Sequence, residues 1–262
     1  MDLELNDKVI IVTGGAAGIG EAISLQIAEE GGIPVIVGRN SEAADKVIEK
    51  LEKKNSTYLN IIKELGTPES CKEVIQKTIE NLGRIDGLVN NAGANDKVGL
   101  ENGSPEKYLA SLEKNLHHYY YLAHYALPYL KKSKGSIVNI SSKTAVTGQG
   151  DTSAYAAAKG AQLAFTREWA VELLPFEIRV NAVIPAEVMT PLYQNWLNTF
   201  DNPEEKLQGI VSKIPLGNRM TTAEEIANAV LFLLSAKASH ITGQHYYVDG
   251  GYVHLDRSIN KS

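Results

Sequence analysis

Length, composition and charge describe a chain of ordinary enzyme size. Its 262 residues are 44% hydrophobic and 22% charged, enough to bury one large core, and no Pro/Gly/Ser-rich linker divides them. The net charge of -5 and the lack of a basic stripe argue against nucleic-acid binding. No apolar run reaches the roughly 18 residues of a membrane span, and the acidic N-terminus does not resemble a signal peptide, so we expect a cytoplasmic protein.

Cysteine and histidine usage gives no sign of a metal site. Cys71 is the only cysteine, so a disulfide within the chain is impossible, and no Cys/His cluster has ligand spacing. His117, His118 and His124 fall in one helical pattern, where we expect a packing role. Any redox chemistry must therefore come from an organic cofactor.

Short apolar strands alternate with helix-period segments along the whole chain. This alternation predicts a Rossmann-type α/β fold, with a doubly wound, parallel sheet of seven strands in one domain over residues 1–262. We expect a dinucleotide-binding part at about 8–150 and a catalytic and substrate part at about 136–262, with ligands at the strands' carboxyl ends. The expected strands are Val9–Thr13, Pro34–Gly38, Thr57–Ile62, Gly87–Asn90, Ser136–Ser141, Arg179–Ile184 and His245–Val248.

The first strand runs into a glycine-rich turn, residues 14–20, and then into a helix expected from about Ile19 to Glu30. Glycines let the backbone approach a pyrophosphate, whose charge then meets the free N–H groups at the helix N-terminus. A turn with no ligand is the alternative interpretation of this segment alone. Strand, turn and helix in this order favour a dinucleotide site.

Tyr155 and Lys159 lie four residues apart, so a helix places them on one face. A phenol with a pKa of about 10 acts as a base near neutrality only when its anion is stabilised, which the ammonium group can do. Such a pair alone more often marks a half-exposed helix face. Its position thirteen residues after Ser142, downstream of the glycine-rich turn, indicates a hydride-transfer enzyme with Tyr155 as acid and base.

These motifs together resemble the short-chain dehydrogenase/reductase family, across essentially the whole chain. The resemblance implies that Ser142 hydrogen-bonds the substrate oxygen and that Tyr155 exchanges its proton. It also implies that Lys159 lowers the tyrosine pKa and holds the nicotinamide ribose, while Asn115, inside a long helix, supports a water relay. Ser141 points to the other face of its strand and is expected to be structural. The matching motifs are 13–20, Asn90-Asn91-Ala92-Gly93, Asn115, Ser142, Tyr155 with Lys159, and Asp249-Gly250-Gly251.

The cofactor implied by the family is NADP or NAD, and the choice depends on the end of the second strand. NAD-preferring members place an acid at the position of Gly38, whereas Arg39 here can pair with a 2′-phosphate. We therefore favour NADP, with NAD left open because Glu42 can occupy Arg39 in an ion pair. The expected cofactor-binding residues are Gly14, Ala17, Gly18, Ile19, Gly20, Arg39, Leu65, Asn91, Ala92, Gly93, Tyr155, Lys159, Val188 and Thr190.

A closer resemblance, to the bacterial L-fucose dehydrogenases of this family, covers residues 115–120, 141–150, 185–193 and 249–257. It implies oxidation of the anomeric hydroxyl of an aldose, L-fucose, L-galactose or D-arabinose, to the lactone. Polar side chains suit such a polyol, because each buried hydroxyl needs a partner. The expected substrate residues are Asn95, Asp96, Ser142, Lys143, Gln149 and Glu187.

Three further inferences are open at this point. A 3-oxoacyl or hydroxysteroid reductase of the same family is the alternative enzyme. A cofactor-binding sensor that lost the chemistry is the alternative outside enzymes, and the intact Ser/Tyr/Lys/Asn set argues against it. Family members are usually homotetramers built on the helices that carry Asn115 and Tyr155, so we expect the same here.

Overall fold

The computed structural model describes residues 2–255, and one parallel sheet of seven strands lies at its centre. The strand order is β3-β2-β1-β4-β5-β6-β7, so the chain reverses its direction of travel between β1 and β4. Open α/β sheets bind their ligands at such a reversal, outside the carboxyl ends of the strands. The strands are β1 (Val9–Thr13), β2 (Ile33–Gly38), β3 (Leu59–Ile62), β4 (Gly87–Asn90), β5 (Ser136–Ile140), β6 (Arg179–Pro185) and β7 (His245–Val248).

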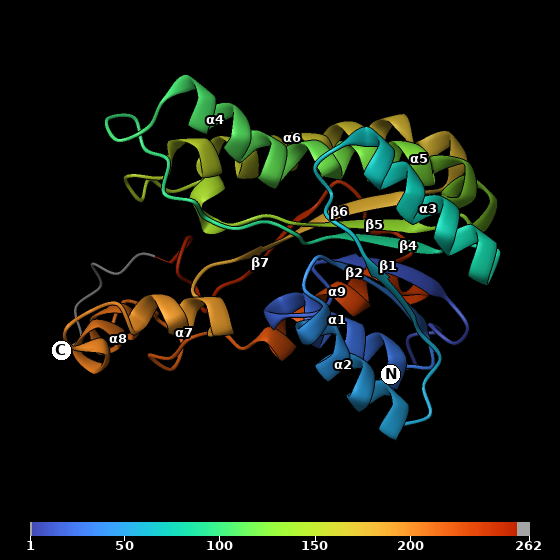
Figure 1. Ribbon diagram of the computed structural model, residues 1–262, viewed down its shortest axis with the longest axis horizontal. Helices are drawn as coiled ribbons and strands as arrows, with labels where there is room; N and C mark the ends of the chain where they lie inside the picture. The colour runs from blue at the N-terminus through green and yellow to red at the C-terminus, as the bar shows by residue number, and fades with distance from the viewer. Residues whose placement is uncertain (1, 256–262) are drawn as a thin grey trace.

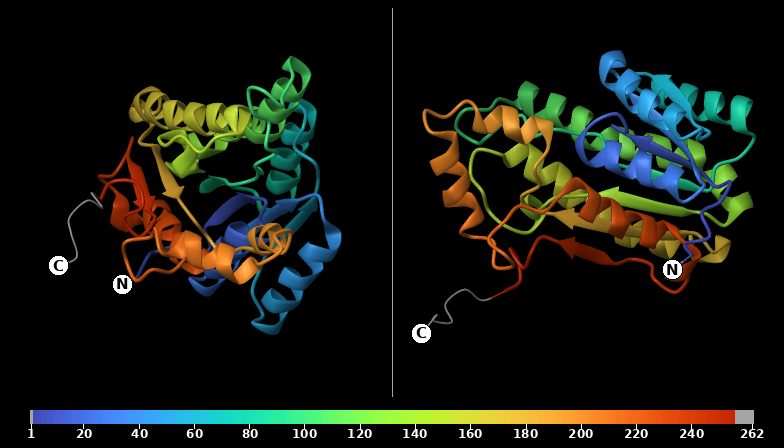
Figure 2. Two further views of the ribbon diagram at one scale, coloured as in Figure 1. Left: turned by 90° about the vertical axis from the view of Figure 1, so that its left-hand side faces the viewer. Right: turned by 90° about the horizontal axis from the view of Figure 1, so that it is seen from below.

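Helices cover both faces of this sheet. They are α1 (Gly18–Glu29), α2 (Ser41–Lys53), α3 (Pro68–Leu82), α4 (Pro105–Leu112), α5 (His118–Ser133), α6 (Ser153–Glu172), α7 (Pro191–Leu197), α8 (Pro203–Val211) and α9 (Ala223–Leu234). In Figure 1, α3, α4, α5 and α6 lie above the sheet, whereas α1, α2 and α9 lie below it. The short helices α7 and α8 project beyond the strand ends, as the two other views also show (Figure 2).

Strand β1 illustrates why the strands are continuous apolar runs. Ile11 packs into the core beneath α3 and α5, where it joins Tyr119. Ile10 on the opposite face joins Ile23 of α1 and Ile226 of α9 in a second core. Because both faces are covered, all five residues of β1 are buried and none of its positions is left for a solvent-facing polar residue.

The predicted fold is confirmed, with strand ends shifted by at most two residues and α1 shifted by one. Asn115 lies inside one long helical segment, as expected, but this segment is not a regular α-helix throughout. The segment is divided into α4, a single π turn η1 (Glu113–His117), and α5. Within residues 2–255, no helix is both long and apolar enough to span a bilayer.

Candidate active site

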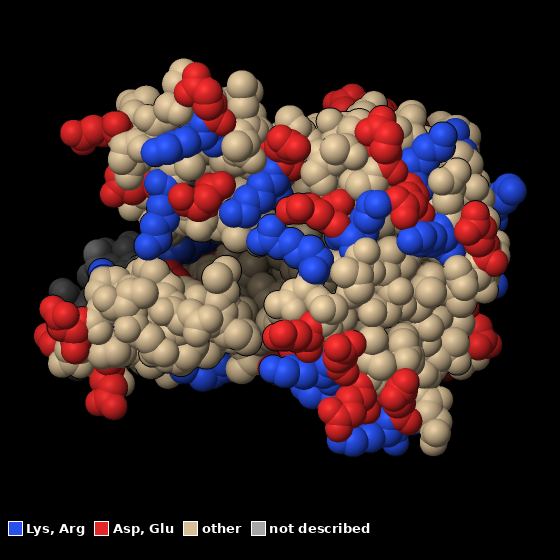
Figure 3. Space-filling view, in the orientation of Figure 1, with Lys and Arg blue, Asp and Glu red and all other residues tan. Residues whose placement is uncertain are grey.

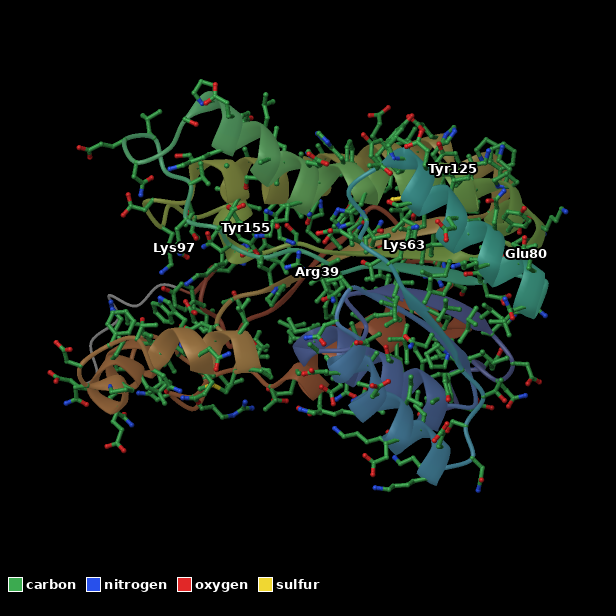
Figure 4. The ribbon with its side chains drawn as sticks, in the orientation of Figure 1. Arg39, Lys63, Glu80, Lys97, Tyr125 and Tyr155 are labelled. Atoms are coloured by element: carbon green, nitrogen blue, oxygen red, sulfur yellow. The ribbon has the colours of Figure 1, made fainter. Side chains whose placement is uncertain are left out.

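The candidate site lies where the loops after the parallel strands converge. In Figure 3 the molecule is hollowed at the middle of the visible face, and charged side chains gather along the upper edge of the hollow. Figure 4, in the same orientation, labels Tyr155 and Arg39 near this hollow. The two labelled residues come from α6 and from the end of β2, far apart in the sequence.

The glycine-rich turn after β1 has a left-handed backbone, which favours glycine, at two positions. Gly14 and Gly18 have φ angles of 65° and 54°, in the left-handed region. At Gly20 a Cβ atom would lie 2.1 Å from the carbonyl oxygen of Gly14, which no real side chain tolerates. The turn therefore brings bare backbone to the start of α1.

The N-terminus of α1 has no side chain that caps it. Ala17 occupies the N-cap position and makes no side-chain hydrogen bond, whereas Asn40, Thr67 and Ser104 cap α2, α3 and α4. Thr190 lies against Gly18, because a Cβ on that glycine would meet its Cγ2 at 3.1 Å. Free N–H groups beside bare glycine backbone fit the pyrophosphate of a dinucleotide.

Thr13 ties the ends of β1 and β4 together beside this turn. Its Oγ1 accepts hydrogen bonds from the backbone N–H groups of Asn91 (2.8 Å) and Ala92 (2.9 Å). The Asn91 amide in turn donates to the Thr13 carbonyl oxygen at 2.8 Å. The predicted ribose-flanking residues therefore lie next to the glycine turn, and the structure brings the two motifs together.

The π turn η1 places Asn115 inside the protein. Its side-chain oxygen accepts from the Ala94 N–H at 2.8 Å, and its Nδ2 donates to the Ser111 carbonyl at 3.0 Å. A fully buried asparagine in a helical segment is thus held from both ends of its amide. The backbone oxygen of Asn115 accepts from the side chain of Gln162 at 2.7 Å, and the water relay expected of Asn115 stays a prediction.

Ser142 follows β5 and begins the short 3-10 helix η2 (Lys143–Ala145). Its Oγ accepts from the backbone N–H of Thr144 at 3.2 Å and from the Thr144 hydroxyl at 3.1 Å, so its own proton points elsewhere. The neighbouring Ser141 is buried and donates to the Lys159 carbonyl at 2.9 Å, the structural role that we expected.

Tyr155 and Lys159 share one face of α6, and Lys159 Nζ lies 5.5 Å from the Tyr155 ring centre. Burial raises the pKa of Tyr155 to about 12, although a hydrogen bond with Ser142 opposes this. Burial also lowers the pKa of Lys159 to about 7. The lowering of the tyrosine pKa by Lys159 stays a prediction, and any such effect acts against the desolvation that raises this pKa.

Arg39 makes an ion pair at the edge of the hollow, but not with the expected residue. Its Nη1 lies 3.0 Å from a carboxylate oxygen of Glu64, after β3, rather than from Glu42 on α2. The parallel pairing of β2 with β3 explains this choice, because Lys63 donates to the Gly38 carbonyl and sets the two strand ends side by side. Leu65, the predicted adenine neighbour, follows directly and is partly buried.

A polar cluster lies next to Ser142. The buried ammonium group of Lys143 pairs with the carboxylate of Glu187, which also accepts from the Tyr193 hydroxyl at 2.7 Å. Lys143 Nζ lies 4.2 Å from the ring centre of Tyr252. Burial and the nearby carboxylate raise the pKa of Tyr193, so its proton stays on the phenol. The sequence prediction named Lys143 and Glu187 but missed Tyr193, whose only signal was its place after Thr190.

The motif after β7 positions Tyr252. Both carboxylate oxygens of Asp249 accept backbone N–H groups, from Gly251 at 2.8 Å and from Val253 at 2.9 Å. Gly250 and Gly251 have positive φ, which closes the turn. The last part of the predicted resemblance, residues 256 and 257, lies outside the described residues.

Two predicted substrate residues are less well placed than Lys143 and Glu187. Asn95 and Gln149 are exposed, and the Asn95 side chain accepts from the N–H of Lys97 in its own loop. Asp96 accepts from the Ser111 hydroxyl at 2.9 Å. In the part of the chain that the structure covers, no three His, Cys, Asp or Glu side chains form a metal-binding group.

The fold and the arrangement at its strand ends are those of an NAD(P)-dependent oxidoreductase. The sequence profile of a family described as enoyl-(acyl carrier protein) reductase matches residues 14–253. With this match and with the relatives below, the chain belongs to the short-chain dehydrogenase/reductase family.

Two relatives of different activity are about equally similar to the chain. The chain is 35% identical to 3-oxoacyl-(acyl-carrier-protein) reductase FabG of Thermotoga maritima over 252 residues, covering 96% of this chain and 100% of the relative. It is 34% identical to L-fucose dehydrogenase of Bos taurus over 245 residues, covering 93% and 88%. The crystal structure of Cj0485 dehydrogenase matches with a TM-score of 0.95 and 51% identity, covering 100% of both chains.

Proposed function

We propose that this enzyme oxidises the anomeric hydroxyl of an aldose, L-fucose or a sugar of its configuration such as L-galactose or D-arabinose, to the lactone. The polar cluster of Lys143, Glu187 and Tyr193 carries this proposal. A lysine, a carboxylate and a phenol next to Ser142 pair with one another and have further hydrogen-bonding capacity for sugar hydroxyls, whereas an acyl chain or a steroid would leave that remaining capacity unused. The similarity to L-fucose dehydrogenase is further support.

In the proposed mechanism Ser142 donates a hydrogen bond to the substrate oxygen, and Tyr155 removes the proton from the anomeric hydroxyl. A bound nicotinamide dinucleotide supplies the acceptor for the hydride that leaves the same carbon. Lys159, in its charged form, stabilises the tyrosine anion. The ring oxygen of the sugar makes the step easier, because it stabilises the positive charge that develops at the carbon.

Substrate kinetics test this proposal. With either nicotinamide cofactor, we expect kcat/KM for L-fucose, L-galactose and D-arabinose to exceed that for D-glucose by about tenfold or more, since each mismatched hydroxyl costs about 1–3 kcal/mol. Glu187→Gln should lower kcat/KM for the sugar while leaving cofactor affinity intact. Glu177→Gln, at an exposed ion pair with Lys134, is the matched control and should behave as wild type.

Three outcomes would contradict the proposed substrate or the proposed enzymatic function. Preference for D-glucose or a steroid would overturn the substrate assignment but leave the dehydrogenase. Preference for a 3-oxoacyl thioester would instead support the activity of the Thermotoga relative. No turnover with any alcohol or carbonyl compound would favour a sensor.

We also propose that NADP is preferred over NAD. The Arg39–Glu64 ion pair is exposed, since the two side chains are 70% and 71% accessible to solvent. Exposed ion pairs of this kind contribute little free energy. Arg39 can therefore turn to a 2′-phosphate and form a stronger, charge-assisted contact. The carboxylate that NAD-preferring members carry at this position is missing, because residue 38 is a glycine. Nothing lies within 4 Å of the place that its Cβ would take.

A double substitution tests this cofactor preference. Gly38→Asp with Arg39→Leu should shift the kcat/KM ratio from NADP toward NAD by roughly ten- to a hundredfold, the equivalent of about 1.5–3 kcal/mol for a charged hydrogen bond. The open space at Gly38 accepts the new carboxylate without displacing a neighbour. An unchanged ratio would mean that Arg39 is merely a surface residue.

We propose a homotetramer as well, following the family. Exposed aromatic and aliphatic side chains on α4, α5 and α6 support a subunit interface on this surface. They include Leu109, Tyr120 and Val171, which are 60%, 50% and 66% exposed. The cytoplasmic location stays a prediction from the sequence.

A further inference from the structure

Gln162 joins two parts of the candidate site, and the mechanism above gives it no role. It lies on α6, three residues after Lys159, and is fully buried. Its Nε2 donates to the carbonyl oxygen of Asn115 at 2.7 Å, and its Oε1 accepts from Lys159 Nζ at 3.2 Å. One carboxamide therefore bridges the π turn and the lysine.

The π turn explains why the Asn115 carbonyl accepts a bond from another helix. In a regular α-helix a carbonyl oxygen pairs with the N–H four residues on. Residues Glu113–His117 depart from that pairing, and the Asn115 oxygen receives the Gln162 amide instead. A carbonyl can only accept, so the NH2 end of Gln162 must face it. Its oxygen must then face Lys159.

Lys159 Nζ has three oxygen neighbours for its three protons. They are the Ile140 carbonyl at 2.7 Å, Gln162 Oε1 at 3.2 Å and the Tyr119 hydroxyl at 3.4 Å. All three groups are uncharged and buried. The other titratable groups facing this lysine are Tyr155 on α6 and His118 on α5, and burial keeps His118 neutral by lowering its pKa to about 4.

We propose that Gln162 is a positioning residue, which holds the Lys159 ammonium in place and fills the space between it and the Asn115 carbonyl. An amide whose two ends are fixed in this way accepts from a charged lysine and cannot itself pass a proton onward. Gln162 bonds the Asn115 carbonyl and Lys159 directly, so a water that linked the same two groups would have to displace this amide. The consequence for catalysis rests on the proposed roles of Tyr155 and Lys159.

Two substitutions separate hydrogen bonding from packing. Gln162→Met keeps an unbranched side chain of similar length but removes both hydrogen bonds. Gln162→Ala opens a cavity lined by the Asn115 carbonyl oxygen, Lys159 Nζ and the Tyr119 hydroxyl. Water can enter such a polar cavity and restore the hydrogen-bonded link between Lys159 and Asn115. If Gln162 only fills space, the Met variant should perform better than the Ala variant. If it acts by hydrogen bonding, the order is reversed.

The ionisation of Lys159 is the decisive measurement, made on the protein without cofactor by NMR of 13Cε-labelled lysine. We expect Gln162→Met to lower the Lys159 pKa by about one unit, because the charged form loses an acceptor, and Gln162→Ala to lower it less. Gln162→Glu should raise it, since a carboxylate favours the ammonium form. Activity at neutral pH should fall about fivefold in the Met variant, because lowering a pKa of about 7 by one unit reduces the charged fraction at pH 7 from about one half to about one tenth.

An unchanged Lys159 titration in both the Met and Glu variants, or better activity for Met than for Ala, would overturn the proposal. If Met fails to fold, the Glu variant and the Ala variant still decide it. The NMR result does not depend on any substrate. A shifted titration together with no turnover of any sugar would therefore sustain the role of Gln162 and reject the proposed function.

Discussion

Tyr155→Phe is expected to lower kcat for sugar oxidation by about 10²- to 10⁴-fold, the usual contribution of a positioned acid or base. The substitution removes one hydroxyl and keeps the ring, so the space beside Ser142 and Lys159 is unchanged. Dinucleotide affinity should therefore stay near that of wild type. Cofactor fluorescence titration and steady-state kinetics on the same preparation would measure both quantities.

A second tyrosine gives the matched control. Tyr125 on α5 lies far from the hollow in Figure 4, and Tyr125→Phe should leave kcat and cofactor affinity unchanged. Equal activity of the Tyr155 and Tyr125 variants would remove Tyr155 from the mechanism. Loss of cofactor binding in the Tyr155 variant would point to a binding role instead.

The same tyrosine should titrate differently in the free and the loaded enzyme. Burial raises its pKa to about 12 in the protein alone, so it is protonated and neutral near neutral pH. An oxidation rate that rises with pH through a pKa below 10 must then reflect the loaded enzyme, where added positive charge favours the phenolate. The difference between the ultraviolet titrations of wild type and Tyr155→Phe, both without cofactor, should give the first value, and the pH profile of kcat should give the second.

Gly20→Ala should reduce dinucleotide affinity by roughly 5- to 150-fold, the equivalent of about 1–3 kcal/mol for overpacking a tight site. The new Cβ would meet the Gly14 carbonyl oxygen at 2.1 Å and the Asn91 amide at 2.7 Å. One methyl group would thus push the glycine turn and the loop after β4 apart. Both segments belong to the proposed cofactor site.

The control for this change lies on the same sheet edge. Gly38→Ala adds the same methyl group where nothing lies within 4 Å, and it should bind the cofactor as wild type does. Thermal unfolding of both variants would show whether Gly20→Ala also weakens the fold. Equal cofactor affinity for the two variants would contradict this prediction, because it would mean that the backbone around Gly20 makes room for the methyl group.

The sequence predicted the sheet because each strand is an apolar run ending in a recognisable turn. Ile10 and Ile11 face different cores, yet both are apolar, so the pattern identifies the strand without showing which face is which. The candidate site was predictable where residues are close in the chain, as with Tyr155 and Lys159. Residues brought together across the fold were harder to predict.

Three features illustrate that limit. Residues 113–117 contain neither glycine nor proline, so nothing in them predicted a π turn rather than an α-helix. Arg39 pairs with Glu64 because strand register, not sequence distance, decides its neighbour. Gln162 looked like any polar position on a helix until the Asn115 carbonyl was found opposite it.

The π turn also constrains how this chain can vary. A π turn holds one residue more than an α-helical turn would, so deleting a residue from 113–117 other than Asn115 would let the segment close as a regular α-helix and leave α5 in its present rotation relative to α4. Tyr119, fully buried, and Tyr120, half exposed, would then keep their surroundings, whereas the Asn115 carbonyl would pair within the helix and lose the Gln162 amide. The surplus residue therefore serves the contact with Gln162 and not the packing of α5, and a one-residue deletion here should spare the fold while it removes that contact.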